Sequence, residues 1–167
     1  MALDMSASAA IWFLPFVLPI CLHVAYTDLA RMKITNKAVL ALGAVYLFLG
    51  PLVLPSFDIY LWGFAHFAIV LLAGFVLNAV GIMGAGDAKF LAFAAPYVRV
   101  ADVSEVFVIL TVVTAAALIT HRAIRISPLR EFAPNWESWT AGKRFPLGLA
   151  LGPSFILYLA LAVLNGA

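Results

Sequence analysis

Charged side chains are scarce in this sequence. Lysine, arginine, aspartate and glutamate make up 11% of the 167 residues, whereas 65% are hydrophobic. Soluble domains carry about 25% charged residues, so a water-soluble core in so short a chain cannot bury this much apolar surface. The composition excludes an ordinary soluble domain and predicts an integral membrane protein whose surroundings are the lipid bilayer. No nucleic-acid partner is expected.

Cysteine is scarce as well. Cys21 is the single cysteine, which excludes an internal disulfide and a multi-cysteine zinc site. The three histidines fall in different apolar runs and lack the spacing of metal ligands. No glycine-rich fingerprint follows a strand, so a nucleotide-type cofactor site is not indicated. We therefore expect neither a metal nor another cofactor.

Long apolar runs make up most of the sequence. A spanning helix needs roughly 20 apolar residues, and six runs approach or exceed this length. Asp4 stands where a signal peptide would carry basic residues, so we expect the first run to be retained. The sequence predicts an all-α polytopic membrane protein with about six transmembrane helices, forming one domain over residues 1–167 without a separate soluble or zinc-binding domain. The predicted helices cover residues 7–27, 38–55, 59–82, 87–100, 103–121 and 146–164.

Basic residues gather in alternate loops. Nine of the ten follow the first, third or fifth run, and Arg99 is the exception. Because basic loops stay in the cytoplasm, these three loops are predicted to be cytoplasmic and both termini periplasmic. The nine residues are Arg31, Lys33, Lys37, Lys89, Arg122, Arg125, Arg130, Lys143 and Arg144.

Two aspartates fall at this predicted cytoplasmic edge. Asp28 follows the first run and Asp87 begins the fourth. Two carboxyls at close range cannot both stay ionised, so one can activate a water while the other keeps its proton. The alternatives are structural: Asp87 could cap the fourth helix, and Asp28 could pair with Arg31 or Lys33. Together, on one side of the membrane, the two acids favour catalysis.

Two nearby polar residues complete the candidate site. Lys89 either reaches a lipid headgroup or tunes the acid pair and contacts substrate. Asn36 either caps the second helix or orients Asp28. Further along the chain, Gly148 and Gly152 have the spacing of close helix packing, and the aromatic residues between 123 and 145 indicate a segment along the inner interface.

Three short segments resemble a known family. "GAGDAK" (84–89) resembles the GxGD motif of membrane aspartyl peptidases. "DLARMKITN" (28–36) resembles the first-aspartate motif of type IV prepilin peptidases, although Thr35 stands where proline is common. "RFPLGLALG" (144–152) resembles their late Pro-x-Gly segment. The short chain, without a cysteine-rich domain, is most similar to the minimal CpaA/TadV-type branch associated with Flp pili.

This resemblance implies a hydrolase, an aspartic endopeptidase of pilus assembly in the bacterial inner membrane. Its substrates would be prepilins and pseudopilins, each a leader followed by an apolar helix, cut at the cytoplasmic membrane face. No methyltransferase activity is assigned. The site would comprise the catalytic residues Asp28 and Asp87, the motif glycines Gly84 and Gly86, and the supporting residues Lys89 and Asn36.

Other functions stay open. A small transporter or channel subunit could place Asp87 in an ion or proton path, because acids within a membrane often mark such paths. Such a protein would carry acids at mid-depth on several helices, whereas Asp28 and Asp87 fall at helix ends. A presenilin-like, signal-peptide-peptidase-like or archaeal preflagellin peptidase is a further alternative. The spacing between Tyr26 and Asp28 and the basic loop that follows fit the prepilin branch better.

Overall fold

The protein is described by a computed structural model that covers residues 2–142 and 144–167, so Lys143 of the predicted cytoplasmic loops lies outside the described residues. Within these residues, five helices are long and apolar enough to cross a membrane, which confirms the prediction of an all-α polytopic membrane protein. The α-helices are α1 (Ala7–Arg31), α2 (Asn36–Val53), α3 (Phe57–Ala79), α4 (Ala85–Ala94), α5 (Val103–Arg125) and α6 (Gly148–Asn165). Short 3₁₀ turns are η1 (Ala95–Tyr97), η2 (Val100–Asp102), η3 (Pro128–Phe132) and η4 (Glu137–Trp139).

Helix α4 is the short one, and the prediction of a helix over 87–100 was too long at its end. It stops at Ala94, two residues before Pro96, which lacks an N–H for the helical ladder. Its 10 residues rise about 15 Å, roughly half the hydrocarbon thickness of a bilayer. Helix α4 alone therefore does not cross the membrane.

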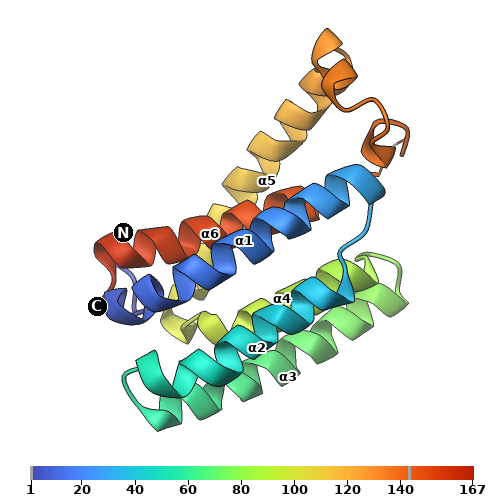
Figure 1. The fold of residues 1–167 in the computed structure, drawn as a ribbon. Helices are drawn as coiled ribbons and strands as arrows, with labels where there is room; N and C mark the ends of the chain where they lie inside the picture. The colour runs from blue at the N-terminus through green and yellow to red at the C-terminus, as the bar shows by residue number, and fades with distance from the viewer. Residues whose placement is uncertain (1, 143) are drawn as a thin grey trace.

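The helices form two groups and an outlier (Figure 1). Helices α1 and α6 lie side by side and antiparallel, α2, α3 and α4 pack together beside them, and α5 leans away. A Cβ at Gly152 would lie 2.5 Å from the carbonyl oxygen of Cys21, so the missing side chain lets α6 approach the backbone of α1. The close packing predicted for Gly152 is confirmed.

An aromatic cluster joins the two groups. Tyr97 of η1 lies at its centre, with ring centroids 4.8 Å from Phe13, 5.1 Å from Tyr46 and 5.3 Å from Phe155. The Tyr97 hydroxyl donates a hydrogen bond to the carbonyl of Leu42, 2.6 Å away, so its polar group is satisfied inside the apolar core. This cluster fixes the C-terminal end of α4, and with it the position of the whole short helix.

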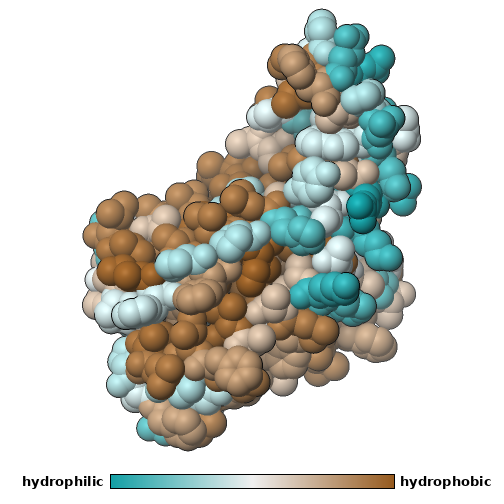
Figure 2. Space-filling model, viewed as in Figure 1, coloured by the Kyte–Doolittle hydropathy of each residue, from teal (hydrophilic) through white to brown (hydrophobic). Residues whose placement is uncertain are grey.

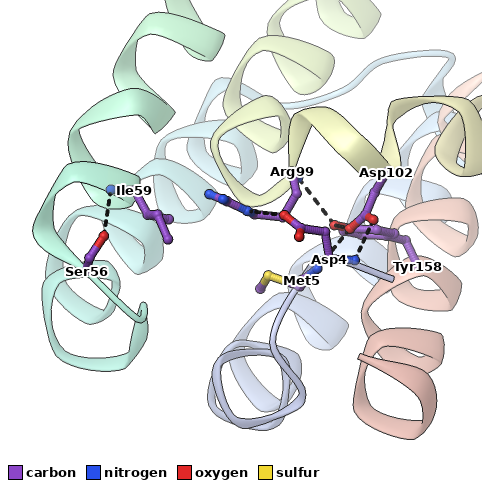
Figure 3. Close-up of polar contacts among 7 residues, drawn as sticks. All are labelled: Asp4, Met5, Ser56, Ile59, Arg99, Asp102 and Tyr158. Atoms are coloured by element: carbon purple, nitrogen blue, oxygen red, sulfur yellow. Dashed lines mark hydrogen bonds and ion pairs between the residues drawn. The ribbon is translucent and has the colours of Figure 1, made fainter. Parts of the chain in front are cut away.

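A buried acid organises the end of the molecule where α1 begins (Figure 3). Asp102 accepts hydrogen bonds from the N–H of Asp4 at 2.6 Å, the N–H of Met5 at 3.0 Å and the hydroxyl of Tyr158 at 2.8 Å. Arg99 forms an ion pair with Asp4 beside it, with 2.9 Å between Nε and Oδ2. Asp102 thus anchors the N-terminal segment to α6, a role that its place in a predicted outer loop did not suggest.

Candidate functional site

Asp28 lies buried in the last turn of α1. Its Oδ2 accepts a hydrogen bond from the N–H of Gly148, the first residue of α6, at 2.6 Å. A Cβ at position 148 would lie 2.9 Å from this same oxygen, so only glycine allows the start of α6 to come this close. Gly148 therefore positions Asp28, in addition to the helix packing predicted for it.

Asp87 lies half-buried in the first turn of α4. The N-cap of this helix is Gly84, so the alternative in which Asp87 caps α4 is wrong. A Cβ at Gly84 would lie 2.7 Å from Asp87 Oδ2, and one at Gly86 would lie 3.2 Å from the Cβ of Ile34. The glycines of the GxGD motif thus leave room for the acid and for the loop after α1.

The two supporting polar residues contact each other. Lys89 Nζ donates a hydrogen bond to Asn36 Oδ1 at 3.1 Å, which links α4 to the start of α2. The N-cap of α2 is Thr35, whose side chain accepts from the N–H of Ala38 at 3.3 Å. Asn36 therefore does not cap this helix, because the threonine that replaces the family's usual proline does so. The amide oxygen of Asn36 instead accepts the hydrogen bond from Lys89 of α4.

The two acids interact electrostatically. Helices α1, α4 and α6 bring Asp28, Asp87 and Gly148 to one end of the bundle (Figure 1). Asp87 lies outside the five long helices, and burial, followed by the negative charge of Asp28, raises the pKa of its carboxyl to about 6. The two motif acids are therefore close enough for the charge of one to act on the other.

Comparison with known families agrees with this convergence. Residues 15–120 match the type IV leader peptidase family, and this range includes both acids and the glycines of the GxGD motif. The chain belongs to the type IV leader peptidase family. It is therefore a peptidase with a type IV leader peptidase-like function, which implies a prepilin substrate in general. Searches of curated proteins and of solved structures found no match.

An aromatic segment of this leader peptidase lies against α1 beside the site. The ring of Tyr26, two residues before Asp28, meets Trp136 edge to face at 6.2 Å. Trp136 stacks on Trp139 at 5.6 Å, and Trp139 stacks on His121 of α5 at 4.9 Å. Sequence reasoning assigned this segment to the membrane interface but gave no contact with α1. The stack ties the loop after α5 to the turn that carries Asp28.

Polar residues gather at the end of the leader peptidase that carries the acids (Figure 2). In this view the hydrophilic residues follow the side where α1 and α5 end, and apolar residues cover most of the rest. Within residues 2–142 and 144–167, no three histidine, cysteine, aspartate or glutamate side chains form a group that could hold a metal ion.

Proposed function

We propose that this leader peptidase is an aspartic endopeptidase whose catalytic residues are Asp28 and Asp87. The observation that carries the proposal is that burial, together with the charge of Asp28, raises the pKa of Asp87 to about 6, although different helices supply the two residues. A carboxyl pair that shares one proton can act as base and acid without a cofactor.

We assign the base to Asp28 and the acid to Asp87. Burial disfavours the charged form of Asp28, but the N–H of Gly148 opposes this effect, because a hydrogen bond donated to a carboxylate stabilises it. Burial and the neighbouring charge favour the protonated form of Asp87. A bound substrate excludes more water from the pair and therefore favours the proton on Asp87 further.

Hydrolysis then follows in two steps. Asp28 takes a proton from a water whose oxygen bonds to the carbonyl carbon of the scissile peptide, while Asp87 donates its proton to the carbonyl oxygen. The tetrahedral intermediate collapses as the C–N bond breaks. The leaving nitrogen takes the proton held by Asp28, and the hydroxyl of the intermediate returns a proton to Asp87. The products are a carboxylic acid and an amine, and the pair regains its starting state.

The supporting residues hold the two acids in place. Gly84 leaves space for the carboxyl of Asp87, and Gly86 lets the start of α4 pack on the loop after α1. The hydrogen bond between Lys89 and Asn36 fixes this end of α4 to α2. These contacts would keep the acids from moving apart when a substrate strand enters.

We propose Flp/Tad-type prepilins and pseudopilins as the substrates. The support is the motif set and the positions of the basic residues, which favour an inner-membrane protein with its acid pair at the cytoplasmic face and its termini in the periplasm. Residues 1–167 would act as a single membrane domain without a cofactor.

Conservative replacement of each acid tests this proposal. Asp28→Asn and Asp87→Asn keep size and polarity but remove the ionisable group, so each should slow prepilin cleavage about 10²–10⁴-fold or more. Asp58→Asn, at an exposed position elsewhere, is the matched control and should cleave normally. Purified variants are incubated with a Flp-type prepilin and the processed product is measured. Full cleavage by either catalytic variant refutes the proposal. Ion flux through liposomes that is lost in Asp87→Asn, without proteolysis in the unaltered protein, supports a transporter instead.

A further inference from the structure

An apolar groove of about 430 Å³ lies beside α4. Residues of α3, α4, α5 and α6 form its walls. Among the described lining residues there is no aspartate, glutamate, lysine or arginine. The groove is thus suited to an apolar occupant, and its lining includes Phe90, Leu91, Ala94, Val106, Leu110 and Leu151.

The groove is open because α5 packs against α6 but stands apart from α3 and α4. Figure 1 shows α5 leaning away from the group of α2, α3 and α4. Of its 23 residues within the described structure, only Ile109 and His121 are buried. The side chains of α5 that face α3 and α4 therefore border space that the protein itself does not fill.

The groove follows the same helix that carries Asp87. Phe90, Leu91 and Ala94 line it within the two turns after that acid, and Val98 lines it beyond η1. From Asp87 to Ala94 the helix rises about 10 Å at 1.5 Å per residue. The groove therefore begins about one turn after Asp87 and runs along α4 toward the opposite end of the bundle.

We propose that this groove binds the apolar transmembrane helix that follows the scissile bond of the substrate, an inference that rests on the proposed function. A helix held along α4 would bring the peptide that precedes it to Asp28 and Asp87. Lipid tails or a second copy of this chain would fill the same space without delivering a peptide bond to the two acids.

Details of the wall fit a helix. Helices associate in a bilayer mainly through close packing and hydrogen bonds, and small residues permit the approach of backbones. Ala94 and Ala95 provide such a surface on α4 and η1. On α6, Ser154 carries a buried hydroxyl that has no hydrogen-bond partner within the described structure. A helix in the groove would pack against the half-buried Ala95, beside the buried Ala94 and Ser154.

Filling the groove from α5 tests the proposal by kinetics. Val106→Trp adds bulk at a lining position, and Val108→Trp adds the same bulk to an exposed position of the same helix that does not line the groove. We expect Val106→Trp to raise KM for full-length prepilin about 10-fold, as overpacking typically costs, and Val108→Trp to leave it within about twofold. Equal KM values for both variants and the unaltered enzyme overturn the groove proposal while leaving the catalytic pair intact.

Photocrosslinking tests occupancy without relying on cleavage. A photoreactive amino acid replaces Leu110, which lines the groove, or Val112, which is exposed on α5 outside it, in the Asp87→Asn background. Membranes that contain prepilin are irradiated and the adducts are mapped by mass spectrometry. Adducts from position 110 to the apolar helix of prepilin, and none from position 112, support the proposal. Adducts from position 110 only to lipid or to a second copy of this chain overturn it. If the unaltered enzyme does not cleave prepilin at all, the proposed function itself is refuted, whichever adducts form.

Discussion

Asp102 and Asp28 are both buried, yet their surroundings differ. Asp102 is 2% exposed and receives three hydrogen bonds, one at Oδ1 and two at Oδ2. Asp28 is 6% exposed, and within the described residues its carboxyl receives one hydrogen bond, from Gly148. A carboxylate can accept about four. The carboxyl of Asp102 is therefore used by the fold, whereas that of Asp28 has acceptor sites left for a water.

Asp102 and Asp28 also differ in the chemical groups that surround them. Asp102 lies among donors, the hydroxyl of Tyr158 and two backbone N–H groups. Asp28 lies near a second acid, Asp87, whose pKa it raises. Placing like charges together opposes folding unless one carboxyl keeps its proton. One end of the molecule thus uses an acid for stability, and the other accepts an electrostatic cost that the proposed hydrolysis would require.

Removing the stabilising acid should have the largest effect on the fold. Asp102→Ala leaves the Tyr158 hydroxyl and the N–H groups of Asp4 and Met5 without their acceptor, at about 1–3 kcal/mol for each buried group. We expect a loss of about 3 kcal/mol or more in the free energy of unfolding, and unchanged cleavage per folded molecule. Thermal melting in detergent and the prepilin assay measure the two quantities. Asp58→Ala, at an exposed position, is the control.

One result would contradict this comparison: Asp102→Ala has the melting temperature of the unaltered protein but no longer cleaves prepilin. Asp102 would then take part in activity, and the assignment of separate roles to the two ends would be wrong.

Gly148 and Gly152 of α6 extend this comparison, because the first contacts Asp28 and the second contacts the backbone of α1. Gly148→Ala places a methyl group 2.9 Å from Asp28 Oδ2 and displaces the carboxyl. A misplacement of about 1 Å can cost about 10²-fold in rate, so we expect kcat to fall by this order with KM little changed. Gly152→Ala is the matched substitution one turn later, where the methyl meets the carbonyl of Cys21. It should lower the melting temperature and leave kcat per folded molecule unchanged.

Steady-state kinetics and melting curves separate these two outcomes. A fall in melting temperature for Gly148→Ala that matches that of Gly152→Ala, with kcat retained, would mean that position 148 serves helix packing alone.

The smallest expected effect concerns pH. Because Asp87 must hold its proton in the proposed mechanism and its pKa is about 6, kcat/KM should decline as the pH rises through about 6. Substrate binding excludes water, so the corresponding decline in kcat should lie at higher pH. In Asp28→Asn the neighbouring charge is gone, and the pKa of Asp87 should fall. Infrared spectroscopy of the protonated carboxyl follows this titration, with Asp87→Asn as the control. A pKa that is equal in Asp28→Asn and the unaltered protein shows that the acids do not interact.

The sequence was sufficient to predict an all-α membrane protein and the approximate positions of its helices, and it indicated both acids of the candidate site. Apolar runs are local signals, and the two aspartates fall beside motif glycines and basic loops. The exact end of α4 was harder to predict, because the aromatic side chains around Tyr97 are apolar whether the backbone is α-helical or turns into η1.

Contacts between distant residues were not predictable from these patterns. The hydrogen bond from Gly148 to Asp28 joins positions 120 residues apart, and the bond from Asp4 to Asp102 joins positions 98 apart. The spacing of Gly148 and Gly152 indicates packing but does not reveal which side chain the first glycine meets. The available signal for this contact was the segment from Pro146 to Gly148, where α6 begins, since the first N–H groups of a helix are free to donate.

Cys21 provides an experimental tool that needs no engineering. It is the single cysteine of the chain, and its thiol is buried where α1 packs against α6 near Gly152. A maleimide or similar reagent should reach it only after the two helices separate. The rate of alkylation in increasing denaturant would therefore report opening of the bundle in every variant, and cysteines introduced at the surface could be labelled selectively in the native protein.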